Sequence, residues 1–214
     1  MTSGKPNRRR LLAALTLLPA LCATAATLDA DALIGRLAKP APATVTFREV
    51  RFSPLVNEPL VVAGELGYDG PTSLDRRVTQ PYHETVAIRG ESVRVEREGE
   101  PVRSFGLNRA PELRGLLSGF TALLAGDPAV LERSFQVAAS GSDAAWTLEL
   151  TPSDARARRR LQQIVVNGRA DVPQCFTMLT ANGGASVLLL GPTADRELPK
   201  PTTLDALKHL CSAE

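Results

Sequence analysis

The stretch that decides the fold runs from Pro59 to Arg97 and reads PLVVAGELGYDGPTSLDRRVTQPYHETVAIRGESVRVER. Apolar and polar residues alternate in short runs, and Gly, Pro or Asp interrupts the alternation about every ten residues. Alternation places successive side chains on opposite faces of a strand, and such breaks are typical of turns in antiparallel sheets. In LVVAGELGY, four apolar side chains share one face: Leu60, Val62, Leu66 and Tyr68. The stretch therefore predicts strands with one apolar face.

The period changes in RAPELRGLLSGFTALLAG, where apolar residues recur at i, i+3, i+4 and i+7. This spacing predicts an amphipathic helix that ends at Gly126. A shorter helix is predicted near the N-terminus, with Asp29 or Asp31 as its cap, and another helix at the C-terminus. The other segments alternate as strands. The predicted class is α+β, mainly β: a curled antiparallel sheet of about ten strands whose open side is covered by helices.

A curled sheet covered by helices, and not by a second sheet, can hold a cavity for an apolar ligand. The periodicity predicts the residues that line this cavity. They are Leu60, Val62, Leu66, Tyr68, Val86, Ile88, Leu113, Leu116, Leu117, Phe120, Leu124, Trp146 and Leu148. Burying one methylene group is worth about 0.8 kcal/mol, so an acyl chain can bind there without a well-placed polar partner.

The first residues have the three parts of an export signal: a basic start, an apolar run and a small-residue cleavage site. The apolar run from Leu11 to Cys22 is too short to span a bilayer. We predict cleavage between Ala25 and Ala26, with cleavage after Ala26 as the alternative. Residues 1–25 are then a signal peptide, and residues 26–214 form one domain in the periplasm.

Two other readings of this signal are open. A lipoprotein signal would end at Cys22, but Leu21 and Pro19 stand where a small and a branched residue are expected. RRRLL suggests twin-arginine export, although basic starts are common in other signals.

Charge argues against nucleic acid as a partner. The chain has 25 basic and 23 acidic residues, and the predicted signal holds four of the basic ones and no acidic one. The remainder, with 21 basic and 23 acidic residues, has a formal charge of −2. Nucleic-acid binding depends on clustered cations. One cluster occurs in DARARRRLQQ: Arg156, Arg158, Arg159 and Arg160. It is either a solvated turn before a strand or a docking patch for an acidic partner or anionic headgroup.

The predicted mature chain keeps two cysteines, Cys175 and Cys211. In an oxidising compartment they are expected to form a disulfide, and two buried free thiols are the alternative. Two His and two Cys without close ligand spacing predict no metal site, and no cofactor is expected.

An enzyme is not indicated. The chain has two histidines, His83 and His209, and no G-x-S-x-G motif. Glu84 follows His83, but neighbours in an alternating strand point to opposite faces, so the two cannot easily act on one substrate.

The order of short motifs resembles the LolA-type periplasmic carriers of outer-membrane lipoproteins, and most closely a LolA-related subgroup. The positions that carry the resemblance are Gly64, Leu66, Tyr68, Pro71, Leu74, Arg76, Pro81, Glu84 and Gly90. The resemblance implies an incomplete β-barrel with a helical lid that carries acyl chains across the periplasm. It also implies an inner-membrane donor and an outer-membrane acceptor as partners, and we expect the carrier to be a monomer.

The chain departs from the family pattern at two places. Gly70 stands where those carriers have an arginine before the proline, and the C-terminal segment ends in Cys211. The cargo is therefore open between a lipoprotein and another lipid, such as a polyene-type lipid or glycolipid. A module that senses lipids or lipoproteins is the other alternative.

Overall fold

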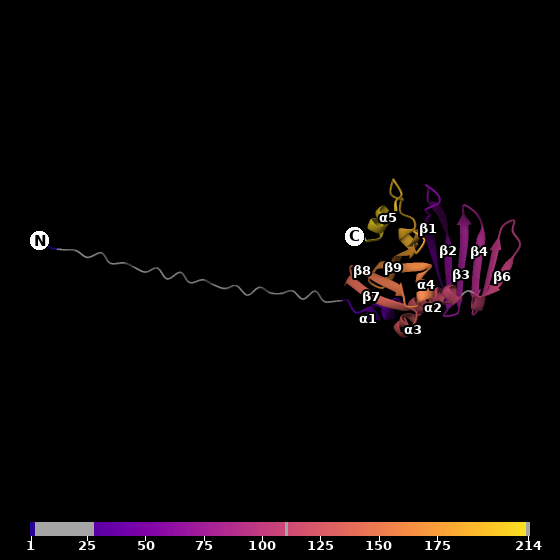
Figure 1. The fold of residues 1–214 in the computed structure, drawn as a ribbon, viewed down its shortest axis with the longest axis horizontal. Coiled ribbons are helices and arrows are strands. Elements are labelled where there is room, and N and C mark those ends of the chain that lie inside the picture. The colour runs from indigo at the N-terminus through magenta and orange to yellow at the C-terminus, as the bar shows by residue number, and fades with distance from the viewer. Residues whose placement is uncertain (3–27, 110, 213–214) are drawn as a thin grey trace.

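Eleven strands form one antiparallel sheet in the computed structural model, which describes residues 1–2, 28–109 and 111–212. The order across the sheet is β6-β5-β4-β3-β2-β1-β11-β10-β9-β8-β7. The strands are β1 (Ala43–Phe52), β2 (Leu60–Gly70), β3 (Ser73–Gln80), β4 (Glu84–Arg89), β5 (Ser92–Arg97), β6 (Arg103–Gly106), β7 (Phe135–Ser142), β8 (Ala145–Pro152), β9 (Leu161–Arg169), β10 (Val172–Thr180) and β11 (Ala185–Leu190). Strands β7–β9 run across the direction of β2–β6, so the sheet curls (Figure 1). Because β6 and β7 are its two edges, it is not closed into a barrel.

Five α-helices and two short 3₁₀ helices accompany the sheet in the described residues. They are α1 (Ala30–Arg36), η1 (Leu107–Arg109), α2 (Pro111–Ala125), α3 (Pro128–Glu132), α4 (Ala155–Arg158), η2 (Gly191–Thr193) and α5 (Leu204–Ser212). Asp29 caps α1 through hydrogen bonds from the backbone N–H groups of Asp31 and Ala32. Helix α2 ends before Gly126, whose φ of 68° favours glycine. Helices α1, α2 and α3 group together, away from α5 (Figure 1).

The main core fills the concave face of the sheet. Phe47 on β1 lies opposite Gly64 of β2 and Leu190 of β11, and the alternation places Val62 and Leu66 on the same face. From the other half of the sheet, Trp146, Leu148, Val166 and Phe176 join this core. Helix α2 closes it, with the Phe120 ring centroid 5.2 Å from that of Phe176. The prediction of a curled antiparallel sheet with covering helices is confirmed.

A second core lies on the convex face, where α5 packs over the middle of the sheet. Val50, Val187, Leu189 and Leu207 are buried there. Cys175 of β10 and Cys211 of α5 form a disulfide, with 5.8 Å between their Cα atoms. The predicted pairing is confirmed, and it fastens α5 to an interior strand.

Two short elements differ from the sequence predictions. The four residues of β6 form an eleventh strand, which pairs with β5 from Ser92 to Val95. The arginine-rich segment, for which a solvated turn is one of the two alternatives, contains the short helix α4, because Asp154 accepts hydrogen bonds from the N–H groups of Arg156 and Ala157.

Some predictions lie outside the described residues. They are the signal peptide, of which residues 3–25 are not described, and the side chains of Leu113 and Leu116. Among the residues whose structure is described, no helix has the length and apolar character needed to span a membrane.

Candidate functional site

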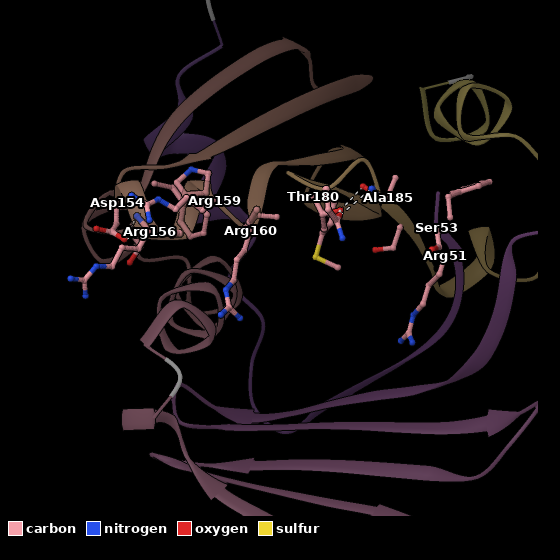
Figure 2. Close-up of a pocket in the computed structure, with 18 of the residues that line it drawn as sticks. Arg51, Ser53, Asp154, Arg156, Arg159, Arg160, Thr180 and Ala185 are labelled. Carbon is pink, nitrogen blue, oxygen red and sulfur yellow. Dashed lines mark hydrogen bonds between the residues drawn. The ribbon is translucent and has the colours of Figure 1, made fainter. Parts of the chain in front are cut away.

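A cavity of about 1380 Å³ opens at the Phe52 end of β1, between the two halves of the curled sheet. Its walls come from β1, β6, the α3–β7 junction, α4, β9 and the β10–β11 hairpin. The lining residues are Glu49, Arg51, Phe52, Ser53, Pro54, Phe105, Arg133, Ser134, Phe135, Pro152, Asp154, Arg156, Ala157, Arg159, Arg160, Leu161, Met178, Thr180, Asn182, Gly184, Ala185 and Ser186. In Figure 2, Arg51 lies at one end of the cavity, Asp154 and Arg156 lie at the other, and Arg160 lies between them.

The wall of this cavity is largely apolar because it continues the concave face of the sheet. Met178 is two residues beyond Phe176 on β10, so both side chains face the same way. Leu161 begins β9, Phe135 begins β7, and Phe105 enters from β6 on the far side. Phe135 is buried, and Leu161, Met178 and Phe105 are half-buried. Together they form a surface that an aliphatic chain can contact.

An ionic network crosses the apolar face next to the cavity. The Glu49 carboxylate, in a residue only 5% exposed, accepts hydrogen bonds from Arg76 at 2.6 Å and from Arg51 at 2.8 Å. The Glu84 carboxylate pairs with Arg97 at 2.7 Å and with Arg76 at 3.6 Å. Burial alone would raise the pKa of Glu49, but the hydrogen bonds and positive charges of Arg51 and Arg76 outweigh it and lower that pKa. Glu49 is therefore a carboxylate held between two guanidinium groups.

Arginines from α4 and its neighbours line the other end. The C-cap of α3, Arg133, comes close to α4 because the Ser153 N–H donates to the Ser134 carbonyl at 2.9 Å. The Asp154 carboxylate is occupied as the cap of α4, and the hydrogen bond from the Ala157 N–H is the main cause of its lowered pKa. Arg158 does not line the cavity, because its guanidinium donates to the carbonyls of Pro152 and Ser153.

A smaller pocket of about 230 Å³ lies at the Ala43 end of β1. It is lined by Lys39, Ala43, Thr44, Val45, Leu66, Gly67, Tyr68, Leu74, Phe120, Leu124, Val172, Pro173, Phe176 and Leu190. Phe47, near the middle of β1, is buried in the main core and lines neither the pocket nor the larger cavity. The smaller pocket is thus an apolar recess under helix α2.

The structure distributes the predicted lining residues over different environments. Leu66, Tyr68, Phe120 and Leu124 line the smaller pocket. Val62, Trp146 and Leu148 are packed in the core, Val86, Ile88 and Leu117 are half-buried, and Leu60 is 43% exposed.

Of the predicted apolar lining residues whose side chains the structure describes, none lines the larger cavity, and the sequence reasoning did not predict this cavity. The one signal for it was the arginine cluster, since Arg156, Arg159 and Arg160 lie on its wall.

The histidines considered for catalysis line neither of these two cavities. Glu84, which follows His83, is engaged with Arg76 and Arg97 and is therefore part of the ionic network. The larger cavity combines apolar side chains with charged ones.

Comparisons with known proteins give one family match and several distant likenesses among solved structures. The model of the family described as outer membrane lipoprotein carrier protein LolA-like matches residues 22–214. Among solved structures, a LolA superfamily protein of Nitrosomonas europaea is 16% identical, with a TM-score of 0.44, over 83% of this chain and 99% of that one. The MucA/MucB complex of Pseudomonas aeruginosa matches at 14% identity and a TM-score of 0.39, over 76% of this chain and 56% of that one. LprF of Mycobacterium bovis matches at 11% identity and a TM-score of 0.35, over 82% and 94%. A search of the curated proteins finds no match.

Proposed function

Because this chain belongs to the outer membrane lipoprotein carrier protein LolA-like family, we propose that it is a carrier that binds acyl chains of a lipoprotein or lipid in its larger cavity. The carrier acts in the periplasm, after removal of residues 1–25, and delivers its cargo toward the outer membrane. It performs no covalent chemistry, and its partners are the cargo, a donor at the inner membrane and an acceptor at the outer membrane.

The observation that carries this proposal is the cavity of about 1380 Å³ on the concave face. Pockets for small ligands usually measure roughly 300–1,000 Å³, so this one has room for a molecule larger than a metabolite. Its wall contains Phe135, Leu161 and Met178, which offer a chain an apolar surface. Burying ten methylene groups is worth about 8 kcal/mol before ordering costs are subtracted.

The open edges of the sheet support release as well as binding. Since β6 and β7 are separate edges, the cavity wall is not a closed ring of hydrogen-bonded strands. A carrier must give up its cargo, and contacts with apolar side chains provide affinity without a covalent bond that would have to be broken. The group attached to the acyl chain distinguishes a lipoprotein cargo from another lipid.

The proposal is tested with a fluorescent hydrophobic probe that acyl lipid displaces. Met178→Glu places a charge on the cavity wall and is expected to weaken probe and lipid binding at least tenfold. Val61→Glu is the matched control, because Val61 is also an apolar strand residue but lies exposed outside both cavities. Circular dichroism verifies that both variants are folded.

The proposal fails if the wild-type protein takes up no probe and no lipid. It also fails if folded Met178→Glu binds as well as the wild type, because the cavity would then not be the binding site.

A further inference from the structure

The wall of the larger cavity carries an excess of positive charge. Its lining includes five arginines and two carboxylates: Arg51, Arg133, Arg156, Arg159, Arg160, Glu49 and Asp154. Both carboxylates are already engaged, Glu49 by Arg51 and Arg76, and Asp154 by backbone N–H groups of α4. Asp154 lies close enough to Arg156 for their charges to interact, but it forms no ion pair with Arg133, Arg156 or Arg159.

Three of these arginines are available for a ligand. Arg133, Arg156 and Arg159 are exposed, and no carboxylate among the described residues forms an ion pair with any of them. They come from two neighbouring elements, the C-terminus of α3 and the helix α4, which the hydrogen bond between Ser153 and Ser134 holds together. Guanidinium groups bind phosphate and carboxylate through paired hydrogen bonds, so this arrangement suits an anion.

The same segments also contribute apolar wall. Phe135 lies two residues after Arg133, and Leu161 directly follows Arg160 at the start of β9. Both apolar side chains line the cavity beside the arginines. A ligand with an anionic group at one end and an aliphatic chain at the other would therefore contact arginines and apolar wall at once.

From this geometry we infer that the cargo is an amphiphile with an anionic headgroup of the phosphate or carboxylate type, held by Arg133, Arg156 and Arg159 while its chain lies on the apolar wall. This inference rests on the proposed function and specifies the chemical class of its ligand. It commits to one molecule that carries both parts, and not to an acidic protein docked on the arginines alone.

The test compares ligands that share one chain and differ in headgroup. Dodecyl phosphate and dodecyl maltoside, each below its micelle concentration, are titrated into the wild-type protein, together with inorganic phosphate and an acidic peptide as arms without an aliphatic chain. We expect dodecyl phosphate to bind at least tenfold more tightly than dodecyl maltoside. Added salt should reduce this preference because it screens charges.

The double variant Arg156→Gln/Arg159→Gln should lose the preference for dodecyl phosphate and keep its affinity for dodecyl maltoside. Arg77→Gln/Arg94→Gln is the matched control. It removes the same charge from exposed arginines outside both cavities and should keep the preference.

The outcomes separate the two proposals. If dodecyl maltoside and dodecyl phosphate both fail to bind, the carrier proposal itself is wrong. If both bind with equal affinity, or the Arg156→Gln/Arg159→Gln variant keeps the preference, the headgroup inference is wrong and the carrier proposal stands. If inorganic phosphate or the acidic peptide binds as tightly as dodecyl phosphate, the arginines form a site independent of the chain, and the inference is overturned.

Discussion

Reduction of the Cys175–Cys211 disulfide should lower the free energy of unfolding by about 4 kcal/mol. The bridge joins residues 36 positions apart, and the loop-entropy relation gives this value for a closed loop of that length. For a chain of this size, each kcal/mol shifts the melting temperature by about 2–4 °C, so the expected decrease is about 8–16 °C. The reduced protein should remain folded, because Leu207 still packs against Val50, Val187 and Leu189.

The assay is urea denaturation monitored by circular dichroism. It compares the oxidised protein with protein whose cysteines are reduced and not alkylated. The affinity for the lipid probe is measured on both forms at low urea. The two affinities should agree within about twofold, because the disulfide lies on the convex face and neither cysteine lines either cavity. A stability loss below about 1 kcal/mol would refute the loop argument. A large loss of probe binding by the folded, reduced protein would show that the two faces of the sheet are not independent.

Further predictions concern buried charge and close packing. Glu49→Gln should destabilise the protein by about 3 kcal/mol at neutral pH, because Arg76 loses a buried partner. Because the pKa of Glu49 is lowered in the folded state, its contribution to stability is present above the unfolded-state pKa and is lost as the pH falls through the folded-state pKa. Urea denaturation between neutral and acid pH should therefore show a steeper loss of stability in the wild type than in the variant. Parallel losses would contradict this prediction. Gly168→Ala should lower the free energy of unfolding by roughly 1–3 kcal/mol, because the added Cβ would overlap the Trp146 ring and the Val172 carbonyl. Gly35→Ala should not destabilise the protein, because Gly35 lies in a helix with open space around it. Equal stabilities of these two glycine variants would show that the packing at Gly168 is not tight.

The fold was predictable where a local pattern determines it. Alternation in LVVAGELGY placed Val62, Leu66 and Tyr68 on one face, and the register with β1 confirms that they share the concave side. Residues of RSFG were too few to show a period, and the four residues of α4 have no apolar periodicity, so β6 and α4 were not predicted. Each forms because of a partner or a cap: β5 for the strand, and Asp154 for the helix.

The larger cavity was not predictable in the same way. Arg51, Arg133 and Leu161 come from distant parts of the sequence, and they meet because the sheet curls and α3 adjoins α4. Alternation tells which face a side chain occupies, but it does not tell how far along a curled sheet that side chain lies from a helix. For this reason Leu60, correctly placed on the concave face, lies exposed beyond both cavities.

The central claim is that an acyl chain occupies the larger cavity. The most direct measurement is photo-crosslinking of the wild-type protein with an acyl lipid that carries a diazirine in its chain, followed by mass spectrometry of the labelled peptides. The account predicts labels on Phe135, Leu161 and Met178, and their loss when an unlabelled lipid competes. Labels confined to the smaller pocket or to α5, or no label that a competitor removes, would contradict it.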